Sequence, residues 1–497
     1  MGNYSSFIKR LQQIMWNDAG INGDAQRIEQ IAWMLFLKVY DIKEDDWAMQ
    51  SKKYTSIIPE KLRWRNWGKD NKDGKALTGE ELLKFVNEEL FPTLKKIKVT
   101  PDTPIKQSIV RTTFEDANQY MKDGVLLRQA LNVIDEVDLG DKEDIHSFGE
   151  IYETILKDLQ SAGNAGEFYT PRAVTEFMAN KVNPKIGDKM ADFACGTGGF
   201  ITSWLNVLQK KIKKADDQKQ FDNSIYGIEK KQFPYILCIT NLLLHGLDNP
   251  CVIHGNSLVN DLLDYTDDDK FDVLLMNPPY GGNEKNDVKN HFPSDLASSE
   301  TADLFMNVCM YRLKKNGRCA IILPDGFLFG TDNAKINIKK KLLNDYNLHT
   351  IIRLPSSVFA PYTPISTNIL FFDNNGSTKE TWFYRMDMPE GIKHFSKTNP
   401  MKKEHFNVVD EWWNNRKEIK DIKADESQSE TYKSKRITIN ELVDLGYNLD
   451  QCGYPTEEKI ILSPEETIKN FVEKRELFDK EMDEKLTEIM SLLGVKR

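Results

Sequence analysis

The chain has 497 residues, enough for about three domains and for a core that requires no disulfide or metal staple. Its 67 Lys and Arg residues are outnumbered by 76 Asp and Glu residues, and the net charge of −9 argues against tight binding of nucleic acid without a partner. The six cysteines form no C-x-x-C pair, so we expect reduced thiols rather than disulfides or a metal site. This pattern is typical of a cytoplasmic protein. The longest apolar run, Ile31–Tyr40, is too short to cross a membrane.

Residues 1–160 are predicted to form an N-terminal helical domain. Between Ile28 and Val39, apolar side chains recur at the three- and four-residue spacing of a helix face. Five of the nine tryptophans lie in this region, namely Trp16, Trp33, Trp47, Trp64 and Trp67. We expect them to anchor a helical core, and the alternative is an aromatic surface for a partner.

Residues 161–390 carry a different pattern, in which short β-type runs alternate with helical stretches. The predicted strands are 189–193, 224–228, 251–254, 271–276, 318–323 and 350–354, then an antiparallel partner of 350–354 at 365–373 and an extension at 381–386. This alternation predicts an α/β domain with a mostly parallel, doubly wound, Rossmann-like sheet.

Residues 391–497 form a polar C-terminal region. The stretch Asp425–Lys435 is predicted to be a loop or disordered. A long amphipathic helix then begins with Ser463 as its N-cap and Pro464 at its first position. This helix is predicted to pack either on its own chain or on a helix of another protein, and the sequence favours neither.

A glycine-rich turn joins the first predicted strand to the helix after it. Glycines let a ligand approach the backbone closely, and the amides at a helix N-terminus stabilise an anion. The turn contains Asp192, Gly196, Thr197, Gly198 and Gly199. The second strand ends at Glu229, whose carboxylate is suited to both ribose hydroxyls of a nucleoside cofactor, unless it is a surface residue beside a structural turn. After the third strand, Asn256 is either a contact for an adenine ring or a turn-forming residue.

The fourth strand, Phe271–Met276, runs directly into Asn277, Pro278, Pro279 and Tyr280. Two prolines fix the backbone and end the strand ladder, which places Asn277 and the Pro278 carbonyl at the edge where α/β sheets bind ligands. Two such acceptors suit methyl transfer to a conjugated amine or amide nitrogen, because they draw its lone pair out of conjugation without a strong base. Tyr280 offers a face for a flipped-out base. A rigid turn without chemistry is the alternative.

Together these segments resemble the modification subunit of type I restriction-modification systems, which methylates adenine N6 in DNA. The resemblance covers most of the chain and includes the loop Gly166–Arg172 (GEFYTPR), Asp303–Phe305, Leu323–Gly326 and Ile352–Phe359 in the family's order. From the residues alone, Thr170 is predicted as the N-cap of a helix that begins at Pro171.

The resemblance implies an S-adenosylmethionine-dependent methyltransferase. It implies cofactor contacts by Glu167, Phe168, Tyr169, Thr170, Pro171, Arg172, Thr197, Gly198, Gly199 and Glu229. Asp192, Gly196 and Asn256 complete the predicted cofactor site, and Asn277 to Tyr280 would hold the target adenine. No metal site is predicted.

The resemblance also implies partners. DNA would be the substrate, and a separate specificity subunit would recognise the sequence, with two modification subunits for each specificity subunit. A motor-nuclease subunit is a further potential partner, and no membrane is expected. The alternatives are a stand-alone adenine-N6 DNA methyltransferase, an N5-glutamine protein methyltransferase and a catalytically inert scaffold.

Overall fold

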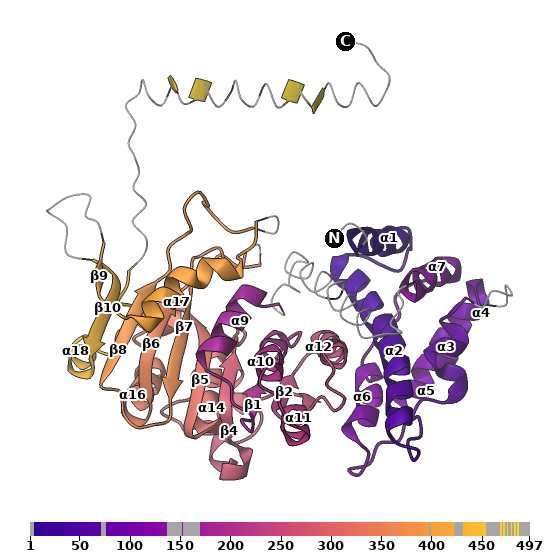
Figure 1. Ribbon diagram of the computed structural model, residues 1–497, viewed down its shortest axis with the longest axis horizontal. Coiled ribbons are helices and arrows are strands. Elements are labelled where there is room, and N and C mark those ends of the chain that lie inside the picture. The colour runs from indigo at the N-terminus through magenta and orange to yellow at the C-terminus, as the bar shows by residue number, and fades with distance from the viewer. Residues whose placement is uncertain are drawn as a thin grey trace. The chain divides into compact units, whose positions relative to one another are not determined.

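The computed structural model describes residues 4–70, 76–136, 152, 169–360, 362–396, 399–421, 431–453 and single positions between 468 and 486 (Figure 1). One compact unit spans Met1–Asp421 and Thr431–Gly453, and a second comprises Ile422–Glu430 and Tyr454–Arg497. The boundary predicted at residue 160 lies outside the described ranges, so the predicted domain limits stay a prediction. Within those ranges, no helix combines the length and apolar character needed to cross a membrane.

The N-terminal part is helical. Its elements are α1 (Tyr4–Trp16), α2 (Asp24–Gln50), η1 (Glu60–Leu62), α3 (Trp64–Trp67), α4 (Gly79–Lys84), η2 (Phe85–Leu90), α5 (Phe91–Lys95), α6 (Ile105–Phe114) and α7 (Gly124–Asp135). Four of the five tryptophans are at most 3% exposed, namely Trp33, Trp47, Trp64 and Trp67, which confirms the predicted aromatic core for them. The prediction was wrong for Trp16, which is 72% exposed at the last position of α1, where the Arg27 guanidinium lies 4.8 Å from its ring centre.

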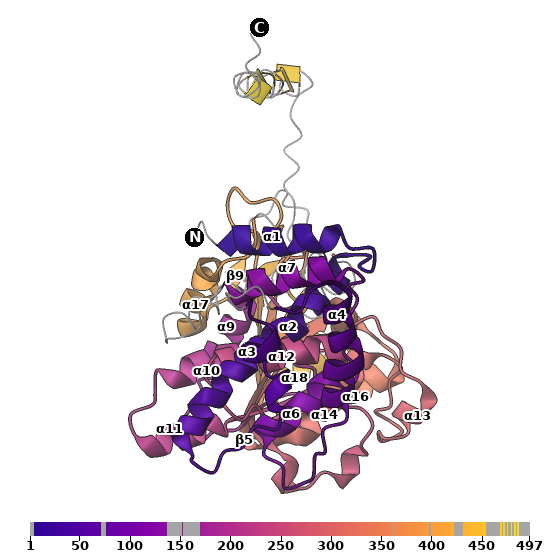
Figure 2. The same ribbon diagram turned by 90° about the vertical axis from the view of Figure 1, so that its right-hand side faces the viewer.

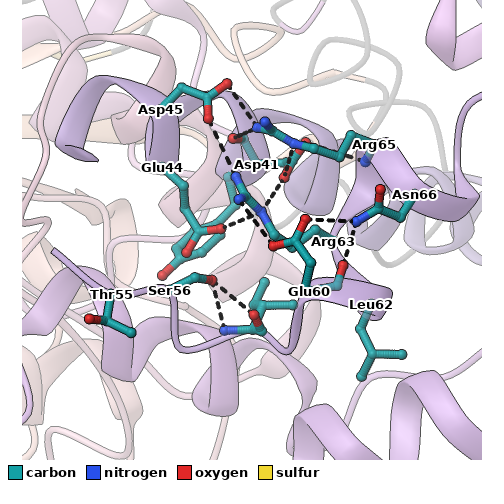
Figure 3. Close-up of polar contacts among 12 residues, drawn as sticks. Asp41, Glu44, Asp45, Thr55, Ser56, Glu60, Leu62, Arg63, Arg65 and Asn66 are labelled. Carbon is teal, nitrogen blue, oxygen red and sulfur yellow. Dashed lines mark hydrogen bonds and ion pairs between the residues drawn. The ribbon is translucent and has the colours of Figure 1, made fainter. Parts of the chain in front are cut away.

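Two arginines, Arg63 just before α3 and Arg65 within it, bind acidic side chains of α2 (Figure 3). Nε of Arg63 lies 2.9 Å from Oδ1 of Asp41 and 3.2 Å from Oε2 of Glu44. Arg65 pairs with Asp41 at 2.9 Å and with Asp45 at 2.8 Å. Burial raises the pKa of Glu44, so the arginine beside it is needed to compensate the charge. These pairs hold the α3 segment on α2.

Helix α12 (Gln232–Leu244) connects the helical part to the sheet, because α2 and α6 pack against it (Figures 1 and 2). Nε2 of Gln232 donates to the carbonyls of Thr112 and Thr113 at 2.8 and 2.6 Å. Beyond the other end of α12, Lys43 pairs with Asp248 at 2.9 Å. The helix that follows the Glu229 strand is therefore held in place by the N-terminal part.

The sheet has ten strands in the order β3-β2-β1-β4-β5-β7-β6-β8-β10-β9. The strands are β1 (Met190–Asp192), β2 (Ile225–Glu229), β3 (Val252–His254), β4 (Phe271–Met276), β5 (Leu313–Pro324), β6 (Asn347–Arg353), β7 (Thr367–Asp373), β8 (Glu380–Arg385), β9 (Ile419–Lys420) and β10 (Tyr432–Thr438). The block from β3 to β5 is parallel, and β7 runs antiparallel between β5 and β6. This confirms the predicted Rossmann-like α/β class and the antiparallel pairing of β6 with β7.

Both faces of the sheet are covered. In β4, Val273 and Leu275 belong to the core that includes α9 (Arg172–Lys181), α10 (Gly199–Gln209) and α12, whereas Leu274 and Met276 belong to the core with α14 (Thr301–Arg312) and α16 (Asn333–Asp345). This is the two-residue alternation of a strand buried on both sides. The helices are α9 (Arg172–Lys181), α10 (Gly199–Gln209), α11 (Ala215–Asp222), α13 (Asn286–Lys289), α14 (Thr301–Arg312), α15 (Asp325–Phe329), α16 (Asn333–Asp345), α17 (Asn407–Asn414) and α18 (Ile439–Asp444), with 3₁₀ turns η4 (Leu262–Asp264), η5 (Asp267–Asp269) and η6 (Lys403–Phe406).

One prediction for the C-terminal region was wrong. Residues Tyr432–Lys435, predicted as a loop, belong to β10, which pairs antiparallel with β8. The segment is polar, but pairing with β8 provides hydrogen-bond partners for its backbone N–H and C=O groups. Ser434 and Ile437 of this strand are 0% and 1% exposed. Residues 425–430 of the predicted loop lie outside the described ranges.

Two buried arginines hold the end of the first compact unit. Nη1 of Arg353 donates to the Gly453 carbonyl at 2.6 Å, and Nη1 of Arg385 donates to the Cys452 carbonyl at 2.9 Å. Arg385 also pairs with Asp421 at 2.6 Å. The residues that lead into the second unit are thus tied to β6 and β8.

The predicted start of the terminal helix, Ser463 and Pro464, lies outside the described residues. The described positions between 468 and 486 are helical. Their apolar members, all at least 46% exposed, are Ile468, Phe471, Val472, Met482 and Leu486. Counted from Ile468, each of the others lies three or four residues away or at a sum of these numbers, which places the described positions on one helix face.

Candidate active site

Three neighbouring strands end at the predicted site residues. β1 pairs in parallel with β2 on one side and with β4 on the other, so their carboxyl ends meet at one edge. β1 ends at Asp192, β2 at Glu229, and Asn277 follows β4. The structure therefore places the glycine-rich turn between Glu229 and residues Asn277–Tyr280, which we call the NPPY turn. This is the sheet edge where open α/β folds bind ligands.

Two glycines of the glycine-rich turn leave little room for a side chain. Gly198, the residue before α10, has a φ of 80°, and a β-carbon there would lie 2.9 Å from Sγ of Cys238. A β-carbon on Gly199 would lie 2.7 Å from Nη1 of Arg172. The turn is consequently compact, and the Arg172 guanidinium lies beside the N-terminus of α10.

The two carboxylates near the turn are buried. Gly196 donates its N–H to Oε2 of Glu229 at 2.9 Å, and Lys231 donates its N–H to Oε1 at 2.8 Å. Burial raises the pKa of Glu229, and these hydrogen bonds oppose the rise. Burial raises the pKa of Asp192 to about 8, and the nearby Glu229 charge adds to this although Ala194 N–H donates to Asp192.

Asn256 lies in the turn after β3, near the same edge. Its Oδ1 accepts the N–H of Leu258 at 3.1 Å, so the side chain shapes the turn. The hydroxyl of the next residue, Ser257, donates to the Phe193 carbonyl at 2.5 Å and links this turn to the glycine-rich turn. The Asn256 side chain is half-buried, and its amide nitrogen is the end left for a ligand.

The segment before α9 lies next to the NPPY turn. Glu167 and Phe168 lie outside the described residues. Tyr169 is buried, with the Arg172 guanidinium 5.8 Å from its ring centre. The predicted N-cap was wrong by one residue: α9 begins at Arg172, with Pro171 before it. The Thr170 hydroxyl instead accepts a hydrogen bond from Nδ2 of Asn277 at 3.1 Å.

The NPPY turn contains a buried acceptor for which the described residues provide no partner. Oδ1 of Asn277 is buried and has no hydrogen-bond partner among the described residues. Tyr280 packs edge-on against Phe359, with ring centres 6.4 Å apart. Burial, with a smaller effect of Tyr362, raises the pKa of Tyr280, so its hydroxyl stays protonated. Phe359 and Tyr362 were not predicted as site residues, although Phe359 belongs to Ile352–Phe359, one of the segments that carry the resemblance to the family.

The loop after the NPPY turn is held by a charged residue that the sequence analysis missed. Nζ of Lys335, on α16, pairs with Glu300 at 2.6 Å and with Asp303 at 3.0 Å. Burial opposes the charge of Lys335, but the hydrogen bond to Glu300 and the Asp303 carboxylate raise its pKa. Thr301 N–H donates to the Gly282 carbonyl at 3.0 Å, which closes the loop. A lysine on a distant amphipathic helix carries no local signal of this role.

Comparison with known proteins identifies the family. Residues 143–461 match the model of the N-6 DNA Methylase family, and residues 4–134 match the HsdM N-terminal domain. The chain is 45% identical over 469 residues to the type I restriction enzyme EcoEI methylase subunit of Escherichia coli, covering 94% of each chain.

Two solved structures agree with this result. A type I modification subunit from Vibrio vulnificus YJ016 is 35% identical, with a TM-score of 0.75, covering 88% of this chain and 92% of the other. A chain from a study of type I assembly and conformational transition is 31% identical, with a TM-score of 0.78, covering 99% and 98%. The chain therefore belongs to the N-6 DNA methylase family and is a methylase subunit of the type I restriction-modification kind, which methylates adenine N6 in DNA.

Proposed function

We propose that this chain binds S-adenosylmethionine at the glycine-rich turn and holds the target adenine at Asn277, Pro278, Pro279 and Tyr280. The observation that carries the proposal is Oδ1 of Asn277, a buried acceptor that no described residue satisfies. Leaving such a group without a hydrogen bond costs about 1–3 kcal/mol, and at the sheet edge where α/β folds bind ligands a substrate that brings the donor would recover this energy.

The residues around the glycine-rich turn suit the proposed cofactor. It would be held by residues 167–172, by the turn 192–199, by Glu229 and by Asn256. Each oxygen of Glu229 accepts one backbone N–H and keeps lone-pair capacity for a ribose hydroxyl. The Arg172 guanidinium beside Gly199 is suited to a carboxylate. When bound, S-adenosylmethionine supplies an electrophilic methyl group on a sulfonium centre.

The NPPY residues act on the acceptor amine. Oδ1 of Asn277 and the Pro278 carbonyl accept the two N–H bonds of adenine N6, which pulls the nitrogen toward tetrahedral geometry and localises its lone pair. Two neutral acceptors suffice, so no strong general base is required. Tyr280 provides a stacking face for the extruded base, and its contact with Phe359 fixes the ring.

We propose that a separate specificity subunit recognises the DNA sequence, with two copies of this chain for each specificity subunit, and that a motor-nuclease subunit adds restriction. The net charge of −9 supports this division of labour, because a chain that gripped DNA alone would carry a basic excess. The match to a chain from a type I assembly also supports it.

The exposed face of the terminal helix is the proposed docking surface for the specificity subunit. Phe471 is 67% exposed on this face, whereas Lys469 lies about 100° round the helix from Ile468. Phe471→Glu should reduce copurification with the partner, as should deletion of residues 463–497, and Lys469→Glu should not. If the truncated chain copurified fully, the terminal helix would not be the docking surface.

Radiolabelled methyl transfer tests the function itself. Label from S-adenosylmethionine should enter DNA when the specificity subunit is present and should be lost with Asn277→Ala, which should still bind the cofactor. Transfer without the partner would indicate a stand-alone enzyme, and label in protein would indicate a glutamine methyltransferase. Substantial transfer by Asn277→Ala would refute the role of Asn277.

A further inference from the structure

Asn277 presents two chemically opposite ends to its surroundings. Its Nδ2 donates to Oγ1 of Thr170 at 3.1 Å, and its Oδ1 is buried without a described partner. A rotation of the amide by 180° would exchange the two ends at almost no steric cost. The rotated amide would then present N–H groups to the amine of adenine, donor against donor, and one of the two acceptors proposed for N6 would be lost.

Thr170 is placed to decide between these two orientations. The residue lies 107 positions before Asn277 in the chain and meets it only through the packing of the α9 segment on the sheet edge. A hydroxyl carries one proton and two lone pairs, so by itself it satisfies either end of an amide. Once its proton is donated elsewhere, however, it is only an acceptor, and Nδ2 is the end that must face it.

The same segment also reaches the glycine-rich turn that would hold the proposed cofactor. Arg172, two residues after Thr170, has its guanidinium beside Gly199 at the start of α10. We propose that Thr170 is a positioning residue: its proton is donated to the cofactor's carboxylate, and its oxygen then fixes the Asn277 amide with Oδ1 toward the target adenine. This inference rests on the proposed roles of Asn277 and of the cofactor turn.

The first test compares Thr170→Val with Thr170→Ser in the assembled complex on its target DNA. Valine keeps the shape of threonine but removes the hydroxyl, whereas serine keeps it. At saturating S-adenosylmethionine, Thr170→Val should slow single-turnover methyl transfer about 10- to 100-fold, the range expected for one critical hydrogen bond, and Thr170→Ser should stay within about 3-fold. Thr240→Val is the matched control, because the buried Thr240 hydroxyl bonds within its own helix to Ile236.

The second test separates orientation from cofactor binding. An aspartate at position 277 has two equivalent oxygens, so its function should not depend on which end faces Thr170. In an Asn277→Asp background, Thr170→Val should therefore cost less than about 3-fold. An equal cost in both backgrounds would overturn the inference.

The third test uses binding without turnover. With 2-aminopurine in place of the base next to the target adenine, addition of S-adenosylhomocysteine should increase the probe's fluorescence in the unmodified complex and in Thr170→Ser, because the extruded adenine leaves its neighbour unstacked. It should fail to do so in Thr170→Val even when S-adenosylhomocysteine is saturating, as checked by calorimetry. A normal increase in Thr170→Val would overturn the inference.

The outcomes distinguish this inference from the proposed function. If Asn277→Ala retained transfer, the role of Asn277 would be wrong and the inference would fall with it. If Asn277→Ala were inactive while Thr170→Val reached the normal rate at saturating cofactor, the proposed function would stand and the orienting role of Thr170 would be wrong.

Discussion

Gly196 donates its backbone N–H to Oε2 of Glu229 at 2.9 Å, which joins the glycine-rich turn to the end of the neighbouring strand. The second carboxylate oxygen accepts the N–H of Lys231 at 2.8 Å. The residue proposed to bind the cofactor ribose therefore also organises the backbone on both sides of the site. We therefore expect cofactor affinity and local stability to depend on the same side chain.

Glu229→Ala should lower the free energy of unfolding by about 2–4 kcal/mol, because two backbone amides lose their acceptor at once. Glu229→Gln keeps one acceptor oxygen, so it should cost clearly less while still weakening cofactor binding. Urea unfolding and calorimetry with S-adenosylmethionine measure the two effects. An alanine variant as stable as the glutamine variant would contradict the organising role.

Asp192 should make stability depend on pH. Its pKa is about 8 in the folded protein against 3.8 for an ordinary aspartate, so the folded state binds the proton more tightly than the unfolded state. The contribution of this group to stability is complete below pH 3.8 and is lost as the pH rises toward 8. Asp192→Asn should remove this part of the pH dependence in urea unfolding between pH 5 and pH 8.5.

The control for this prediction is Asp216→Asn, because the Asp216 side chain is 83% exposed. That variant should follow the pH dependence of the unmodified protein. Identical slopes for Asp192→Asn and the unmodified protein would show that Asp192 does not titrate in this range.

Alanine substitutions at two glycines with the same backbone angle should distinguish the cost of backbone strain from the cost of a steric clash. Gly198 and Gly246 both have a φ of 80°, but a β-carbon on Gly198 would lie 2.9 Å from Cys238, whereas one on Gly246 meets nothing within 4 Å. Gly246→Ala should cost about 1–2 kcal/mol for the left-handed backbone alone. Gly198→Ala should cost more, and adding Cys238→Ala should recover the difference. Equal costs for the two glycines would refute the steric part.

Arg63 should be essential for the stability of the N-terminal helices. Arg63→Met leaves the Glu44 carboxylate, 1% exposed, without its cationic partner although the Tyr54 hydroxyl still donates to Oε1, and a broken buried ion pair costs about 3–5 kcal/mol. Lys61→Met removes an ion pair with Glu89 in which the lysine is 70% exposed, and such pairs contribute less than about 1 kcal/mol. Urea unfolding of both variants checks the contrast, and similar costs would contradict it.

The amino-acid sequence by itself determined the features whose signals are local. The strands β1, β2 and β4 and the motifs at their ends were predictable, because apolar runs, glycines and prolines constrain the backbone within a few residues. The order of these motifs indicated the family, and the comparisons confirmed it. The chemistry proposed for Asn277 also followed from the residue types at the strand end.

The tertiary structure decided which distant side chains meet. Thr170 was predicted as a helix cap because its neighbours favour one, yet packing places its hydroxyl against Asn277. Lys335 gave no signal because an ion pair across the fold leaves no periodicity in the sequence. The polar segment of β10 became a strand because β8 offers it an unpaired edge, and such pairing energy depends on a partner that the segment itself does not contain.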